Sequence, residues 1–319
     1  MSVKMENKRF IALGDLIADF YYNGTKLLAF DGGSTRYNVI ANLASSNCKC
    51  ALIGGSGDDL IGKKIIKRQE KLNIDTSKIF LRNRPIRAYY LSIIQDRLPE
   101  VVYKCSKKSP QNNESTWYDN TKSDITYYYN KVKDNDVIVL DDVDEFSVTV
   151  INQFLCDKII DLGNTKQIQK LQDEELETLK GKFKIMQLNE RVVPYLCRRL
   201  KCKDILEISK FFEPELMIIT HGKNGAEFVF ENKVYNKTLP KIAKEIDCTG
   251  AGDAHLSVFI KEYYKNFQNI DENFIDETFL KAANLTYDVV QKVGARGHIY
   301  SRMMESGIIK EKNDLEHSL

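Results

Sequence analysis

The sequence predicts an α/β protein whose doubly wound, mostly parallel sheet is flanked by helices. Short runs of apolar residues, typical of strands that are buried on both faces, recur along the chain. Segments with the apolar spacing of helices lie between these runs, and the links are short. With 43% hydrophobic residues, the 319-residue chain can form one large core, so we expect a single domain over residues 1–319.

The first half of the chain opens the alternation of strand and helix. The apolar run Phe10–Gly14 ends in glycine and indicates a buried strand, and Val39–Ser45 fits a helix. The run Cys50–Ile53 indicates the next strand, and the glycine-rich segment Gly54–Asp58 predicts a turn after it. The helix Leu60–Leu72 has isoleucines at near-helical spacing, which predicts one buried face.

The second half repeats this alternation. The predicted strands are Val137–Leu140, Lys158–Ile160, Lys184–Met186, Leu216–Thr220 and Ala226–Phe230. The predicted helices are Ser147–Leu155, Glu174–Lys182, Val192–Leu200, Leu206–Phe212 and the segment that contains Ala254–Ile260. Strands separated by helices in this way favour a parallel sheet that is covered on both faces.

Two regions depart from the alternation. Phe20–Phe30 and Arg87–Lys104 are rich in aromatic and β-branched residues, alternate in part, and are not followed by helices. We expect Ala88–Ile94 and Glu100–Lys104 to pair as antiparallel strands around a turn at Gln95–Pro99. A small sheet that projects from the α/β body could serve as a lid, as an ordinary β-extension or as a homodimer contact.

The overall composition excludes several classes of function. The net charge is +2 with acidic and basic residues interspersed, so nothing indicates nucleic acid or a membrane surface as a partner. No apolar stretch approaches the ~20 residues that span a bilayer. The polar N-terminus lacks a secretory signal, and the seven cysteines include no metal-type C-x-x-C pair. We therefore expect a cytoplasmic protein with reduced thiols.

The most informative stretch is Asp247-Cys248-Thr249-Gly250-Ala251-Gly252-Asp253. Its glycines leave backbone N–H groups unshielded just before a helix, where those groups and the helix dipole favour an anion. A carboxylate beside a bound phosphate would repel it, unless Asp253 takes a proton from a hydroxyl that attacks the phosphate. The alternative is a glycine-rich turn with Asp253 as a helix-capping acid.

This heptapeptide resembles the C-terminal signature D-T-x-G-A-G-D of the ribokinase-like (PfkB) family of carbohydrate kinases. The resemblance implies a ribokinase-like fold with a small antiparallel β lid, inserted within about 16–31 and 86–106. It also implies that Asp253 is the general base and that the amides of Gly250, Ala251 and Gly252 form an anion hole.

A second match lies near the N-terminus. Gly14 to Asp19 fits the family's G-x-x-x-x-D, which implies that Asp19 accepts hydrogen bonds from substrate hydroxyls. The segment from Gly32-Gly33 to Asn38 resembles the family's G-G signature with N-x-A, with one residue more than usual. Gly32, Gly33 and Asn38 are then expected at the substrate, and the insertion brings in Arg36.

Weaker matches indicate the nucleotide side. Thr220, Gly222 and Gly225 fit the family's T-x-G-x-x-G turn, which approaches the nucleotide phosphates. Asn189 fits the start of the family's N-x-x-E motif, in which the glutamate helps to order Mg²⁺. The fourth position of the motif is Val192 in this sequence, so we assign no metal ligand. Asn284 resembles a late-helix residue that borders the adenine.

The expected function is an ATP- and Mg²⁺-dependent kinase for an alcohol on a small polyhydroxylated substrate, of which a sugar is the simplest. A nucleoside would need an aromatic shelf, for which Tyr22, Phe30, Tyr37 and Tyr89 are candidates. A phosphorylated or acidic sugar would need cations, for which Arg36, Arg87 and Lys104 are candidates. An alternative of another class is a non-catalytic sugar or nucleotide sensor, which would have no need of a base. His221 and His255 are expected to be packed and hydrogen-bonded.

Overall fold

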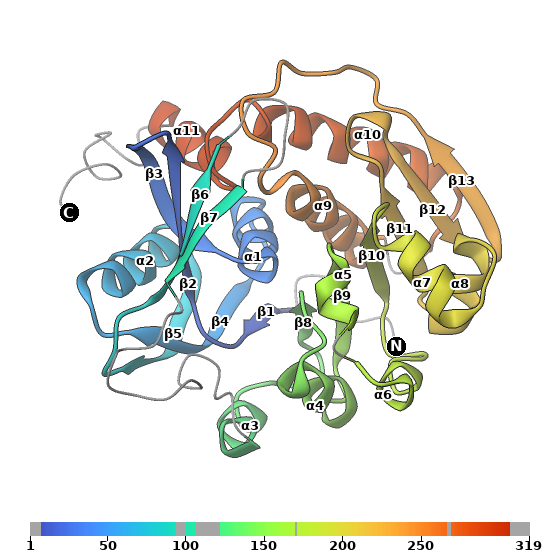
Figure 1. Cartoon of the computed structure of the whole chain (residues 1–319), viewed down its shortest axis with the longest axis horizontal. Coiled ribbons are helices and arrows are strands. Elements are labelled where there is room, and N and C mark those ends of the chain that lie inside the picture. Colours follow the sequence, from blue (N-terminus) through green and yellow to red (C-terminus); the bar gives the residue numbers. More distant parts are fainter. Residues whose placement is uncertain (1–7, 94–99, 106–121, 170, 267–268, 307–319) are drawn as a thin grey trace.

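The structure, a computed structural model, describes residues 8–93, 100–105, 122–169, 171–266 and 269–306. For residues 100–105, 122–124 and 167, only the backbone is described. Within these residues the chain forms a nine-stranded sheet in the order β13-β12-β11-β10-β9-β8-β1-β4-β5 and a four-stranded sheet in the order β3-β2-β6-β7 (Figure 1). The predicted α/β architecture, with a large sheet and a small one, is confirmed.

The large sheet is parallel from β5 to β11, and only its β12 and β13 edge is antiparallel. Its strands are β1 (Phe10–Leu13), β4 (Cys50–Gly57), β5 (Ile74–Arg82), β8 (Val137–Leu140), β9 (Asp157–Leu162), β10 (Ile185–Asn189), β11 (Leu216–Thr220), β12 (Ala226–Phe230) and β13 (Lys233–Lys237). Because parallel strands all end at the same edge, the loops after β1, β8, β9, β10 and β11 meet there.

Helices cover both faces of this sheet, so its strands are apolar on both sides (Figure 1). Phe10 and Ala12 of β1 pack in one core with α1 (Thr35–Ser45), α2 (Leu60–Lys71), α9 (Ala251–Lys265), α10 (Glu272–Val289) and α11 (Gly297–Glu305). Ile11 and Leu13 pack in the other core, which α3 (Lys122–Tyr129), α4 (Glu145–Gln153), α5 (Thr165–Gln169), α6 (Asp173–Glu177), α7 (Val193–Leu200) and α8 (Ile205–Phe212) cover.

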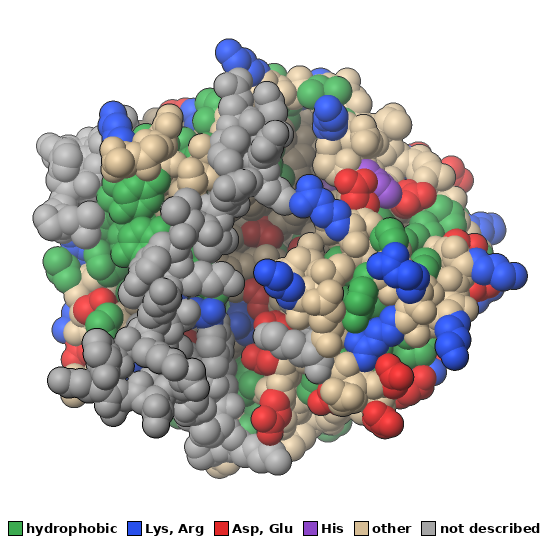
Figure 2. Space-filling model, in the orientation of Figure 1, with side chains coloured by type: hydrophobic (Ala, Val, Ile, Leu, Met, Phe, Trp, Pro, Cys, Tyr) green, Lys and Arg blue, Asp and Glu red, His purple; other side chains and the backbone are tan. Residues whose placement is uncertain are grey.

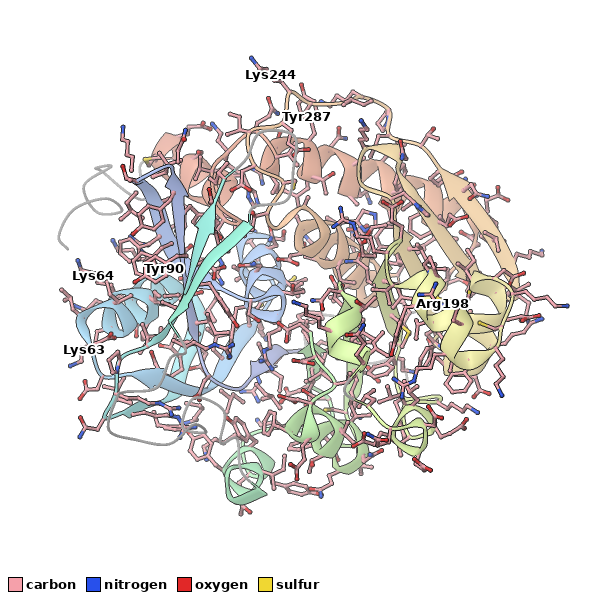
Figure 3. The ribbon with its side chains drawn as sticks, viewed as in Figure 1. Lys63, Lys64, Tyr90, Arg198, Lys244 and Tyr287 are labelled. Carbon is pink, nitrogen blue, oxygen red and sulfur yellow. The ribbon has the colours of Figure 1, made fainter. Side chains whose placement is uncertain are left out.

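The four-stranded sheet consists of β2 (Ile17–Asn23), β3 (Lys26–Gly33), β6 (Arg87–Ser92) and β7 (Glu100–Cys105). Both hairpins, β2–β3 and β6–β7, are antiparallel, while β2 and β6 run parallel. Side chains alternate between its faces, so Phe20 stacks on Tyr90, which is labelled in Figure 3, with ring centroids 5.2 Å apart, whereas Asp19 and Tyr89 share the opposite face. The predicted turn at Gln95–Pro99 lies outside the described residues.

Several local predictions were wrong. The predicted turn Gly54–Asp58 lies mostly in β4, because its glycines allow close contact inside the sheet rather than a turn. A Cβ on Gly54 would lie 1.6 Å from the carbonyl oxygen of Gly14. Helix α1 begins at Thr35, so Asn38 is helical, and the helix predicted over 174–182 ends at Glu177.

None of the helices in the described residues is both long and apolar enough to cross a membrane.

Candidate active site

The heptapeptide leads into helix α9 as predicted, but the helix begins within it, at Ala251. Gly250 caps the helix with φ 83°, in the left-handed region that favours glycine, and Asp253 is the third helical residue. The loop before it is fixed by the buried Asp247, whose Oδ1 accepts hydrogen bonds from Thr249 N (2.9 Å) and Oγ1 (2.6 Å). Its Oδ2 accepts from Gly294 N at 2.7 Å. The carboxylate thereby joins two loops that are far apart in the sequence.

The first-turn amides of α9 differ in their availability to an anion. The N–H of Ala251 donates to Cys248 O at 3.2 Å, so it is occupied in this conformation. The N–H of Gly252 belongs to the helix end, where no intrahelical acceptor exists. A Cβ on Gly252 would meet only Gln187 Nε2, at 3.6 Å, so this part of the backbone is open on its side-chain face. Unlike Ala251, Gly252 therefore has an N–H without an intrahelical acceptor, on backbone that no side chain of its own shields.

The carboxylate of Asp253 is held by a chain of hydrogen bonds. Asn38 Nδ2 donates to Asp253 Oδ2 at 2.8 Å, and Asn38 Oδ1 accepts from Arg296 Nε at 3.0 Å. Arg296, which is 2% exposed, also donates from Nη1 to Gln69 Oε1 at 3.0 Å. Because a guanidinium can only donate, it fixes the oxygen of the Asn38 amide toward itself and the NH₂ group toward Asp253.

Burial raises the pKa of three carboxyl groups at this edge of the sheet. The pKa of Asp253 rises to about 6, because burial outweighs the hydrogen bonds from Asn38 and Thr35 that lower it. Burial raises the pKa of Asp19 to about 7 against the lowering effect of Arg296. It raises that of Asp161 to about 8, with a further contribution from Asp253. Acidic side chains lie at the bottom of a hollow on this face of the molecule (Figure 2).

The paired glycines make room for two of these side chains. A Cβ on Gly33 would lie 2.2 Å from the carboxyl group of Asp19, and one on Gly32 would lie 3.0 Å from Arg296 Nη1. The packing of Asp19 and Arg296 therefore explains why glycines are needed at positions 32 and 33. Contact of Gly32 and Gly33 with the substrate stays a prediction.

Of the candidate cations, Arg36 is already paired. It is 5% exposed, and its Nε lies 3.2 Å from Asp141 Oδ1. Asp141 Oδ2 also accepts hydrogen bonds from Ser34 Oγ and from Arg36 N. Arg87 lies on β6, where it donates to the hydroxyl of Tyr89, and the side chain of Lys104 is outside the described residues.

The structure brings only one of the four candidate aromatic side chains beside Asp19. Tyr22 and Phe30 lie on the opposite face of the small sheet, with Phe20 and Tyr90. Tyr37 is 1% exposed in the core, so it offers no surface to a ligand. Tyr89 pairs with Asp19 across β2 and β6 and shares its face.

The candidate nucleotide residues lie on neighbouring elements. Asn189 and Thr220 pair in register at the ends of β10 and β11. Gly222 and Gly225 have φ values of 54° and 101° in the turn that follows, and a Cβ on Gly225 would lie 2.0 Å from Lys237 O. Asn284 is exposed on α10, and no described hydrogen bond joins it to these residues.

At the fourth position of the family's N-x-x-E motif, where an acid is expected, this chain has Val192. Val192 is 0% exposed, and Glu190 Oε2 is bonded to His221 Nδ1 at 3.0 Å. The other ring nitrogen of His221 is 2.7 Å from Glu227 Oε2, so the imidazole is hydrogen-bonded on both sides. Among the described residues, no group of three or more His, Cys, Asp or Glu could hold a metal ion.

A second buried network was not predicted from the sequence. Gln187 Nε2 donates to Asp161 Oδ2 at 2.7 Å and to Gly252 O at 3.1 Å, while its Oε1 lies 3.1 Å from His255 Nδ1. Burial lowers the pKa of His255 to about 4, so it is a neutral, packed imidazole. A polar residue inside an apolar strand, as at 161 and 187, was the signal for this network. Asp141 and Arg296 were also missed.

The comparisons with known proteins bear on the family and the fold. The family model described as "pfkB family carbohydrate kinase" matches residues 29–298. Among curated proteins, no sequence matches the chain.

Similar solved structures share the fold at low sequence identity. The ribokinase of Thermotoga maritima superimposes with a TM-score of 0.65 at 15% identity, covering 94% of this chain and 99% of that one. An uncharacterized sugar kinase of Pyrococcus horikoshii in complex with ATP gives 0.67 at 18% identity, covering 90% and 93%. A nucleoside kinase of Methanocaldococcus jannaschii gives 0.68 at 16% identity, covering 95% and 99%.

Proposed function

The chain belongs to the pfkB family of carbohydrate kinases and is a phosphotransferase, and on this premise we propose a reaction and roles for its residues. The protein transfers the γ-phosphoryl group of ATP to a hydroxyl group of a small polyhydroxylated substrate, with a sugar as the simplest case. The observation that carries the proposal is the buried carboxylate of Asp253 in the glycine-rich first turn of α9.

Asp253 acts as the general base. The substrate oxygen forms a bond to the γ-phosphorus, the bond from that phosphorus to the oxygen of ADP breaks, and the hydroxyl proton passes to Asp253. A pKa of about 6 suits this role, because the carboxylate is mostly ionised at neutral pH yet is a stronger base than an exposed aspartate. The Asn38 amide keeps Oδ2 in place.

The remaining residues hold and stabilise the reactants. Asp19 accepts hydrogen bonds from other substrate hydroxyls, and the Gly252 amide donates to the phosphoryl oxygens, with the helix dipole adding to the effect. The small sheet carries Asp19 and lies over the substrate side, so its closure would exclude water as a competing acceptor.

ATP would lie against the ends of β10 and β11, near Asn189, Thr220 and the glycines of the following turn. Mg²⁺ is proposed only as the ion that accompanies the nucleotide phosphates, where it neutralises their charge. The described residues offer no three-ligand cluster, and Val192 replaces the expected acid.

An activity screen tests the proposal. Wild-type protein with ATP and a library of sugars, sugar phosphates, sugar acids and nucleosides should form ADP and a phosphorylated product with some members. Asp253→Asn should reduce kcat by about 10²- to 10⁴-fold, as expected for loss of a general base. The matched control is Asp58→Asn, since Asp58 is an exposed surface partner of Lys63. Full activity in Asp253→Asn would contradict the assignment.

A further inference from the structure

Gln187 is a buried polar residue inside an apolar strand. It is 1% exposed in β10, and its neighbours on the same face of the large sheet include Ile159, Ile185 and Ile218, all fully buried. Burying an amide among such side chains is unfavourable unless its polar atoms are hydrogen-bonded. An apolar side chain of similar size would fill the same space without that requirement. Packing alone therefore does not explain the amide at this position.

The polar atoms of this side chain are all hydrogen-bonded, and two of the three contacts are on α9. Nε2 donates to Gly252 O at 3.1 Å and to Asp161 Oδ2 at 2.7 Å, and Oε1 lies 3.1 Å from His255 Nδ1. Because a backbone carbonyl can only accept, the NH₂ group of Gln187 faces Gly252. The amide oxygen then faces His255, whose Nδ1–H is the donor.

The two contacts on α9 lie on either side of Asp253. Gly252 and His255 are three residues apart, so they are on the same face of the helix. Two hydrogen bonds to one face hold the turn between them against rotation about the helix axis. Asn38 on α1 holds the Asp253 carboxylate from another direction, at 2.8 Å. The first turn of α9 is thus held by both of the elements that lie beside it, β10 and α1 (Figure 1).

Strand β10 also leads to the residues proposed to lie near the nucleotide. Asn189 is two residues after Gln187, so it is about 6.6 Å further along the strand. It pairs there with Thr220 of β11. One short strand therefore connects the proposed nucleotide side with the turn that carries the proposed base. Phosphoryl transfer depends on this alignment, because a misplacement of about 1 Å can cost about 100-fold in rate.

We propose that Gln187 is a positioning residue for phosphoryl transfer, whose amide fixes the first turn of α9, with Gly252 and Asp253, relative to the end of β10. The inference rests on the proposed function, because it takes Asp253 as the base and places ATP at the end of β10. Gln187 touches neither reactant in this role and acts through its hydrogen bonds to α9. His255 supports it by fixing the orientation of the amide.

Kinetic measurements on Gln187→Met test this role. Methionine fills the same space without an amide, so both reactants should still bind while the base is held less firmly. We expect kcat to fall by about 10- to 100-fold, with the KM values for ATP and for the polyol within about 2-fold of the wild type. The matched control is Ile185→Val, which shortens a buried side chain on the same strand and face. It should melt at a lower temperature than the wild type and keep its kcat.

Hydrogen exchange provides a readout that does not depend on activity. Mass spectrometry on the whole protein should show the backbone amides of residues 251–255 exchanging about 3- to 10-fold faster in Gln187→Met, as expected for the loss of one hydrogen bond. Ile185→Val should leave these amides unchanged.

His255→Phe is a second variant for the same contact. It keeps an aromatic ring among Phe228, Phe259 and Phe279 and removes only the donor to the Gln187 oxygen. We expect the same local increase in exchange and a loss of kcat of about 2- to 10-fold. This variant tests the proposal even if Gln187→Met does not fold.

Three results would overturn the proposal. One is a wild-type kcat in Gln187→Met, or in His255→Phe if the methionine variant does not fold. Another is an equal loss of kcat in Gln187→Met and Ile185→Val, which would show a structural role only. The third is unchanged exchange over residues 251–255. A wild type that phosphorylates no acceptor would refute the proposed function, while the exchange comparison would still decide whether Gln187 holds the turn.

Discussion

Replacement of Arg296 by methionine should lower the stability of the protein and should raise the pKa of the proposed base, Asp253. The guanidinium donates to Asn38 Oδ1 and Gln69 Oε1, each at 3.0 Å, and lies 3.8 Å from Asp31 Oδ1. Methionine would leave the amide oxygens of Asn38 and Gln69 buried without this donor. Breaking a buried ionic network costs about 3 to 5 kcal/mol, so we expect a loss of that size in the free energy of unfolding.

The same substitution should shift the pH dependence of activity. Arg296 lowers the pKa of Asp253 and of Asp19 through its charge, so its removal should raise both. The carboxylates would then be ionised only at higher pH, and the acid limb of kcat/KM should move upward from its wild-type position near pH 6 to 7.

Denaturant unfolding and a pH–rate profile measure the two effects. Arg302→Met is the matched control, because Arg302 and Asp288 form an ion pair that is about half exposed, at 53% and 51%. Such surface pairs contribute about 0 to 1 kcal/mol, and the pH profile of this variant should not move. If Arg296→Met unfolds like Arg302→Met and keeps the wild-type acid limb, the role given to Arg296 is wrong.

Two further substitutions test the packing of the site. Gly33→Ala should raise KM for the polyol substrate, because the new Cβ would lie 2.2 Å from the carboxyl group of Asp19. Gly163→Ala is the control. Its Cβ would meet only Asp161, at 3.9 Å, so the kinetics should change little. Because burial raises the pKa of Asp161 to about 8, its contribution to stability is full below pH ~4 and declines as the pH rises toward 8. Asp161→Asn should therefore be more stable than the wild type at pH 8 by at least about 1 kcal/mol, measured by denaturant unfolding; an unchanged or lower stability there would contradict the assigned burial.

Local patterns were sufficient for the parts of the site that depend on neighbouring residues. The apolar run Ala254–Ile260 predicted a helix directly after the glycine-rich heptapeptide, and in the structure this helix starts at Ala251, with Asp253 in its first turn. The apolar runs predicted most of the parallel strands, because such strands are buried on both faces. Strand β5 was missed, since all of its residues but the first are exposed or partly exposed and no continuous apolar run marks it.

Long-range contacts could not be predicted in this way. Arg296 meets Asn38 across 258 positions of the sequence, and Asn38 meets Asp253 across 215. The glycines at 32 and 33 indicated close approach, but only the fold shows that the groups they accommodate are Arg296 and Asp19. Such contacts depend on how distant segments of the chain pack against one another. The spacing of residues in the sequence does not predict this packing.

The most direct measurement is a crystal structure of the wild-type protein with its polyol substrate and a non-hydrolysable ATP analogue. The account predicts a carboxylate oxygen of Asp253 within about 2.6 to 3.2 Å of the acceptor hydroxyl, with the Gly252 N–H directed at the terminal phosphate. An acceptor hydroxyl that instead contacts another side chain, with Asp253 still bonded only within the protein, would contradict it.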